Sequence, residues 1–157
     1  MSGVDIPGLL RALGEGKVEY VLIGAAALAA HGPVRATEDL DVVPDPDPEN
    51  LRRLGNVLAS LEARLAGDPA RELGAEERAA LGRGGNLTLE TALGGLDVVQ
   101  RLAGVPSYVE LVDDAVEMEL FGIPVLVCSR RHLRAMKLAR GSHRDLADVE
   151  DLDATED

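Results

Sequence analysis

The stretch that decides the fold runs from residue 35 to residue 43 and reads RATEDLDVV. It places two carboxylates, Asp39 and Asp41, two residues apart in an otherwise apolar run. Because side chains alternate along a β-strand, both carboxylates face one side of the sheet, while Leu40 and Val42 face the other. Two carboxylates about 7 Å apart on one strand face repel each other, so a cation is expected between them. The stretch therefore predicts a strand that binds a divalent metal ion.

A glycine turn precedes this strand. Residues 18–23 read VEYVLI, which predicts a buried strand, and the strand is broken at Gly24 before a small-residue segment at 25–31. A strand that leads through a glycine into a helix can bind phosphate, because the first backbone N–H groups of the helix point toward an anion. The small side chain of Ala25 lets a triphosphate approach the main chain. Gly24 and Ala25 are thus candidate nucleotide-binding residues.

A third carboxylate follows further along the chain. Residues 95–99 read GLDVV and place Asp97 in another apolar strand. Three carboxylates on two strands can hold two Mg²⁺ ions, or Mn²⁺ in their place, and two metals about 3.5 to 4 Å apart are the usual clamp for nucleotidyl displacement. We therefore take Asp39, Asp41 and Asp97 as the candidate metal ligands.

These motifs resemble those of the DNA polymerase β-like nucleotidyltransferase superfamily. The resemblance rests on Gly24, on residues 32–41 and on residues 96–98, and it covers about residues 20–152. The R-x-T-x-D-x-D form, together with Lys137 and the segment 144–152 (RDLADVEDL), looks most like the minimal AbiEii-type nucleotidyltransferases of bacterial toxin–antitoxin systems. The resemblance implies an α/β (α+β) fold, in which a mixed β-sheet is flanked by helices and short helices end the chain.

The resemblance also implies roles for individual residues. Asp39 and Asp41 would bind both metals, and Asp97 would bind the catalytic one and accept the proton of the attacking hydroxyl. Lys137 would face the nucleotide, with Asp145 close to it. Lys137 also stands out by composition, because the chain has fourteen Arg and only two Lys. The implied nucleotide-binding residues are Gly24, Ala25, Arg35, Thr37 and Lys137, and the implied catalytic residues are Asp39, Asp41, Asp97, Lys137 and Asp145.

The implied function is transfer of NMP from an NTP to an RNA 3′ end, such as that of tRNA, by a toxin that has a cognate antitoxin. Alternative hypotheses are an antitoxin-type protein adenylyltransferase and a transferase that modifies a small molecule such as an aminoglycoside. A degenerate, non-catalytic nucleotide-binding module is a further alternative, because Ala25 stands where the family usually carries Gly or Ser.

Composition and charge limit the possible domain organisation and acceptors. With 157 residues, of which 46% are hydrophobic, the chain suits one domain over 1–157, with a core at about 15–127 and a helical element at about 129–152. The net charge of −12 argues against a broad nucleic-acid surface and favours non-RNA acceptors. A basic stretch nevertheless offers either a solvated helix face or a site for a triphosphate or an RNA end, and its residues are Arg130, Arg131, Arg134, Lys137, Arg140 and Arg144.

No signal peptide and no 18-residue apolar span is found in the sequence, so we expect a cytoplasmic protein with no membrane partner. Periodicity and turn residues then predict the order of the elements. Helices are predicted at 6–14, 25–31, 48–65, 75–81, 107–113, 129–140 and 144–152, and strands at 18–23, 39–43, 86–91, 96–100, 116–120 and 123–127.

Overall fold

The computed structural model describes residues 3–33, 35–68 and 72–155, so the two ends of the expected 1–157 domain and residue 34 of the family motif lie outside it. In the described part, seven strands form one mixed sheet in the order β3-β4-β5-β2-β1-β7-β6. The strands are β1 (Tyr20–Ile23), β2 (Asp39–Pro44), β3 (Arg64–Leu65), β4 (Leu87–Thr91), β5 (Gly94–Val98), β6 (Val116–Leu120) and β7 (Ile123–Val127). The sheet is mixed because β2 pairs parallel with β5 but antiparallel with β1.

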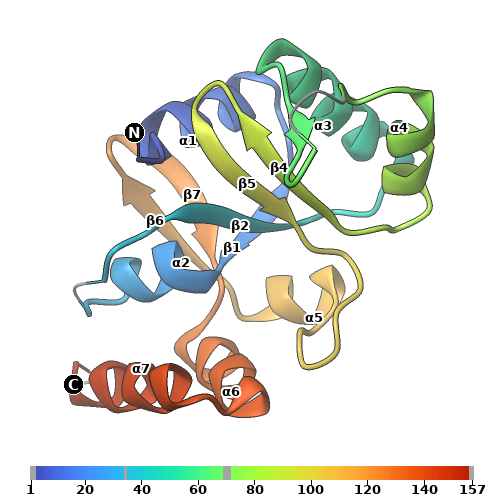
Figure 1. Ribbon diagram of the computed structural model, residues 1–157. Helices are drawn as coiled ribbons and strands as arrows, with labels where there is room; N and C mark the ends of the chain where they lie inside the picture. Colours follow the sequence, from blue (N-terminus) through green and yellow to red (C-terminus); the bar gives the residue numbers. More distant parts are fainter. Residues whose placement is uncertain (1–2, 34, 69–71, 156–157) are drawn as a thin grey trace.

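Helices cover both faces of this sheet (Figure 1). They are α1 (Ile6–Glu15), α2 (Gly24–Ala30), α3 (Pro48–Ser60), α4 (Ala75–Gly82), α5 (Tyr108–Asp113), α6 (Arg130–Arg140) and α7 (His143–Ala154). Helices α1 and α3 lie on one face, whereas α2, α5, α6 and α7 lie on the other (Figure 1). The predicted fold, a mixed sheet flanked by helices with short helices at the end of the chain, is confirmed.

The core between the sheet and α1 and α3 is almost entirely aliphatic. Leu40 of β2 and Leu96 of β5 are fully buried, because alternation turns them away from the face that carries the aspartates. Their partners in this layer come from the apolar stripes of the two helices, where Leu9, Leu10, Leu13, Leu54 and Leu58 are all fully buried. The aspartate-bearing strands are therefore anchored from behind by their alternate residues.

One predicted helix is too long. Residues 48–65 were expected to form a single helix, but α3 ends at Ser60, and Arg64 and Leu65 form the edge strand β3 against β4. The chain turns at Glu62, whose φ of +54° is left-handed. The leucine spacing does not reveal this turn, because Leu61 and Leu65 fit a helical stripe as well as a bend followed by a strand.

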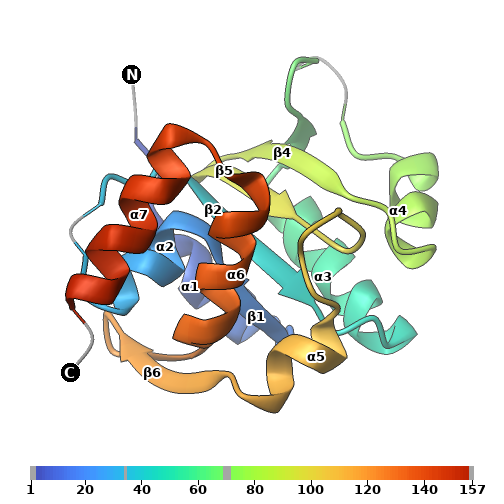
Figure 2. The same ribbon diagram turned by 90° about the horizontal axis from the view of Figure 1, so that it is seen from below.

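The two C-terminal helices form an antiparallel pair. Helix α6 ends at Gly141, whose left-handed φ of +67° closes the helix, and Ser142 then caps α7. Figure 2 shows α6 and α7 lying side by side in front of α2, and Figure 1 shows that α2 lies between them and the sheet. None of the helices in the described part of the chain has the length and apolarity that crossing a bilayer requires.

Candidate functional site

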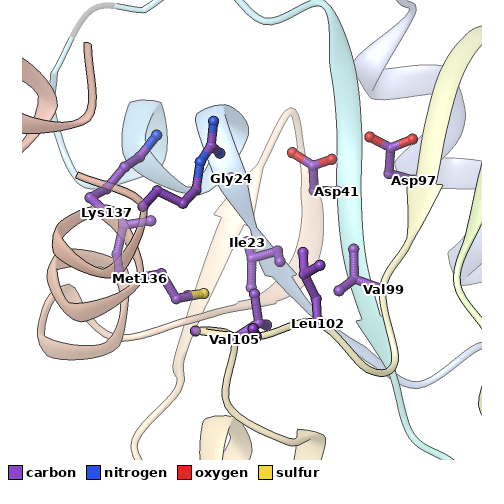
Figure 3. Close-up of a pocket in the computed structure, with 13 residues that line it drawn as sticks. Ile23, Gly24, Asp41, Asp97, Val99, Leu102, Val105, Met136 and Lys137 are labelled. Carbon is purple, nitrogen blue, oxygen red and sulfur yellow. The ribbon is translucent and has the colours of Figure 1, made fainter. Parts of the chain in front are cut away.

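The three predicted metal-binding aspartates lie on one face of two neighbouring strands. In the parallel pairing of β2 with β5, Asp41 lies opposite Asp97, and Asp39 lies opposite Gly95. Figure 3 shows Asp41 and Asp97 on adjacent strands with their carboxylates pointing the same way. Alternation thus places Asp39 and Asp41 on one face of the sheet as predicted, and the pairing of β2 with β5 brings Asp97 to the same face.

Two glycines make room for these carboxylates. A Cβ added at Gly24 would overlap the carboxylate of Asp41, and a Cβ added at Gly95 would overlap that of Asp39. Gly24 also has a φ of +74°, a left-handed conformation that side chains rarely adopt. The strand-to-helix turn at Gly24 therefore serves first to admit Asp41, a role that the sequence did not reveal.

The carboxylates disfavour one another's charge. Burial raises the pKa of Asp41 most, and a hydrogen bond with Asp97 and the charges of Asp97 and Asp39 add to it, so the pKa reaches about 7 although the charge of Lys137 lowers it. The pKa of Asp39 is also raised, first by burial and then by the charges of Asp97, Glu90 and Glu38. Negative charge is thus concentrated at this point of the sheet.

An oxygen-rich donor set of this kind fits a hard divalent cation such as Mg²⁺. Asp41 and Asp97 are within hydrogen-bond range of each other, whereas the carboxylate of Asp39 rests over Gly95. Within residues 3–33, 35–68 and 72–155, no three His, Cys, Asp or Glu side chains are already grouped to hold a metal ion. The expectation of a metal ion here therefore rests on the carboxylate donors, because these side chains are not yet arranged as a complete coordination shell.

Cations stand opposite the aspartates, around a buried carboxylate. Lys137 on α6 places Nζ 2.9 Å from Oδ2 of Asp148 on α7, and 3.8 Å from Oδ1 of Asp145. Arg35, just before β2, forms an ion pair with Asp148 and a second, at 3.3 Å, with the exposed Asp151. The family resemblance implies Asp145 as the neighbour of Lys137, but Asp148, which the sequence does not single out, is the closer partner.

Asp145 has a separate role at the start of α7. Its Oδ2 accepts hydrogen bonds from the Ser142 hydroxyl at 2.6 Å and from the Ser142 backbone N–H at 3.2 Å, while the Ser142 hydroxyl accepts from the Asp145 N–H. This reciprocal pair is a capping box. Burial alone would raise the pKa of Asp145, but the Ser142 hydrogen bonds and the charges of Arg140 and Lys137 lower it below its usual range.

Between the aspartates and the cations lies a hollow of about 280 Å³, which we call the polar cleft. Its carboxylate side is formed by Asp39, Asp41 and Asp97. Ala25, in the turn after β1, also borders it. The other charged side chains that line it include Arg35, Lys137, Arg140, Arg144 and Asp148. Most of the predicted nucleotide-binding residues therefore meet in one cleft.

A second hollow, which we call the apolar cleft, has a volume of about 420 Å³ and opens beside the first (Figure 3). Its walls come from β1, the loop after β5 and α6, and they are formed mainly by Ile23, Val99, Leu102, Val105, Leu133 and Met136. Both clefts are bordered by Gly24, Asp41, Asp97, Lys137 and Arg140. The apolar cleft is not predictable from the sequence, because its lining residues come from three separate segments.

Thr37 is the predicted site residue that the structure does not bring to either cleft. It lines a separate small pocket together with Ala26, Ala30 and Phe121. Arg140 and Arg144, which the sequence offers as part of the basic stretch, line the polar cleft, and so does Asp148, which the sequence does not single out. The i, i+3 spacing of Asp145 and Asp148 is the signal that could have found Asp148, since it places both on one helix face.

Much of the basic stretch is paired within the protein. Arg131 binds Asp114 at 2.9 Å, and Arg134 binds Asp153 at 3.2 Å. Arg130 donates to the backbone oxygens of His31 and Leu152. The cations of this stretch that line the polar cleft are Lys137, Arg140 and Arg144.

No family model matches the chain, and no curated protein matches it either. Solved structures do match it. The solution structure of the antibiotic-resistance factor ANT(2″)-Ia has a TM-score of 0.63 and 17% identity, and the match covers 96% of this chain and 81% of that one. The lincomycin-bound crystal structure of the lincosamide antibiotic adenylyltransferase LnuA also has a TM-score of 0.63, with 13% identity, and the match covers 99% and 100% of the two chains.

An antigenic nucleotidyltransferase-like protein from Paracoccidioides brasiliensis is similar as well, with a TM-score of 0.59 and 19% identity over 94% of this chain and 72% of that one. At these identities the likeness shows the fold, which is that of nucleotidyltransferases. The toxin–antitoxin branch and the residue roles stay predictions.

Proposed function

We propose that the chain is a metal-dependent nucleotidyltransferase, which transfers NMP from an NTP to an acceptor hydroxyl. The observation that carries this proposal is the polar cleft, where Asp39, Asp41 and Asp97 face the cations Lys137 and Arg140. Clustered carboxylate oxygens suit a divalent cation, and a cationic wall suits a polyphosphate. Together they match the two halves of a metal–triphosphate complex.

Asp39, Asp41 and Asp97 would hold Mg²⁺, for which Mn²⁺ can substitute. Two bound ions would neutralise the charge that develops on the α-phosphate and on the leaving pyrophosphate. Asp97 would accept the proton of the acceptor hydroxyl while the hydroxyl oxygen forms a bond to the α-phosphorus. The bond between the α-phosphorus and the bridging oxygen then breaks, and pyrophosphate leaves with the electron pair.

The two clefts would divide the nucleotide between them. Lys137, Arg140, Arg144 and Arg35 would bind the phosphates in the polar cleft, because each presents N–H donors to phosphate oxygens. The apolar cleft beside Asp41 and Asp97 would take the nucleobase, whose flat faces are better matched by aliphatic side chains than by charged ones.

Charge and ion pairing favour a small-molecule acceptor over the RNA end that the family resemblance implied. Glu38 and Glu90 add negative charge beside Asp39, and the chain carries a net charge of −12. Arg131 and Arg134 of the basic stretch are paired with Asp114 and Asp153, so they add little net positive charge for an RNA backbone. Two structural neighbours, ANT(2″)-Ia and LnuA, are an antibiotic-resistance factor and an antibiotic adenylyltransferase.

The test is a transfer assay with each of the four α-³²P-labelled NTPs and Mg²⁺. Three acceptor pools are compared: total RNA, a protein extract, and a panel of aminoglycosides and lincosamides. We expect label on a small molecule, no label with Asp97→Asn, and unchanged transfer with the surface control Asp153→Asn. Label on RNA or on protein would support a nucleotidyltransferase with a different acceptor. The proposal would be contradicted if no pool were labelled and the folded protein also failed to bind Mg-NTP.

A further inference from the structure

We propose that Asp148 is a positioning residue, which holds Lys137 and Arg35 together at the polar cleft so that both cations meet the triphosphate. The inference rests on the proposed function and deepens it, because it names the residue that organises the phosphate-binding cations. Nothing in the motifs that point to the fold assigns a role to Asp148.

The geometry gives each oxygen of this carboxylate one cation. Oδ2 of Asp148 lies 2.9 Å from Nζ of Lys137, and Oδ1 accepts a hydrogen bond from Arg35. The Asp148 side chain is only 2% exposed, compared with 11% for Lys137 and 22% for Arg35. A carboxylate this buried has little access to water, so its two ion pairs are its main stabilisation.

The other carboxylates near these cations are weaker partners. Oδ1 of Asp145 lies 3.8 Å from Lys137, and Oδ2 of the same residue is bound by Ser142. Asp151 lies 3.3 Å from Arg35, but its side chain is 56% exposed, so water screens the pair. Asp148 is therefore the principal counter-charge for both cations.

The three residues come from three separate segments. Arg35 precedes β2, Lys137 lies on α6 and Asp148 lies on α7. Without the shared carboxylate, two like charges would lie close together on one side of the cleft and would turn outward to water. Holding them in place before the nucleotide arrives removes an ordering cost from phosphate binding. Binding of a triphosphate should then depend on Asp148, while binding of a monophosphate should not.

The experiment compares the affinities for ATP and AMP, with Mg²⁺ and without an acceptor, by calorimetry. Asp148→Asn keeps the shape of the side chain and removes its charge. We expect the wild-type protein to prefer ATP, and we expect Asp148→Asn to reduce the ATP-to-AMP affinity ratio at least tenfold while the AMP affinity changes less than twofold. Asp153→Asn, on the same helix but paired with Arg134 at the surface, should leave the ratio unchanged.

A second comparison separates positioning from a structural role. Adding Lys137→Gln to Asp148→Asn should lower the ratio little further, because the two residues act through one contact. Equal losses for ATP and AMP, or an unchanged or increased ratio, would overturn the inference. If Asp148→Asn does not fold, Asp148→Glu, which moves the charge by one methylene, should still lower the ratio, and an unchanged ratio there overturns it too.

The outcomes also separate this inference from the proposed function. Folded wild-type protein that binds neither nucleotide would overturn both. Wild-type protein that prefers ATP, with a variant that keeps the same preference, would overturn only the role of Asp148.

Discussion

At the scale of single residues, Asp41 is a predicted metal ligand whose ionisation should also change the stability of the folded protein. Its pKa in the folded protein is about 7, against an ordinary value of 3.8. Between these values, the folded state holds a proton that the unfolded state has released. The contribution of Asp41 to stability is therefore present below about pH 4 and is lost as the pH rises through about 7.

We therefore expect Asp41→Asn to be more stable than the wild-type protein at pH 8 in EDTA, by about 1 to 2 kcal/mol, and to differ little at pH 4. Mg²⁺ should reverse this order at pH 8, because the ionised wild-type carboxylate binds the metal and the amide binds it poorly. Thermal unfolding at the two pH values, with EDTA or Mg²⁺, measures both effects. A wild-type protein that gains stability from pH 4 to pH 8 relative to the variant would contradict the account.

The glycines beside the aspartates support a second prediction. Gly95→Ala would displace the carboxylate of Asp39 without straining the backbone, so we expect a change in stability below about 1 kcal/mol but at least a tenfold loss of transfer. Gly24→Ala should lose transfer and also about 1 to 2 kcal/mol of stability, because its φ is left-handed.

Denaturant unfolding and the transfer assay together check both glycine variants. Gly55→Ala is the matched control, since an added Cβ there meets nothing within 4 Å. Full transfer by Gly95→Ala would show that the position of the Asp39 carboxylate does not matter.

At the scale of elements, prediction succeeded where a local pattern determines the structure. Alternation alone places Asp39 and Asp41 on one face of β2, and the parallel pairing with β5 adds Asp97. Prediction failed where tertiary contacts decide. The bend at Glu62 and the choice of Asp148 over Asp145 as the partner of Lys137 depend on how α3 and α7 pack, which periodicity does not encode.

The start of α7 supports a prediction about stability. Ser142→Ala removes one half of the capping box with Asp145, so we expect the free energy of unfolding to fall by about 1 kcal/mol. Lys137 and Asp148 keep their contacts, so transfer should change less than twofold. Denaturant unfolding and the transfer assay measure the two effects, and a large loss of transfer at unchanged stability would show that the box acts on the cleft directly.

At the scale of the whole molecule, one sheet connects all of the parts. The aspartates lie at its middle, and the C-terminal helices complete the cleft from the same face. The sequence predicted one domain over 1–157, and we therefore expect a single cooperative thermal transition whose calorimetric and van't Hoff enthalpies agree. Two separate transitions, with the C-terminal helices melting first, would instead mean that the cleft closes and opens independently of the sheet.

The central claim is that the aspartates and the cations form one metal-dependent triphosphate site, and it can be tested without knowing the acceptor. The measurement is a calorimetric titration with an ATP analogue that has a methylene bridge between its α- and β-phosphates, in Mg²⁺ or in EDTA. We predict binding in Mg²⁺, at least a tenfold loss in EDTA, and no binding by a folded protein that carries both Asp41→Asn and Asp97→Asn. Binding that is equally tight in EDTA, or unchanged in the double variant, would contradict the account.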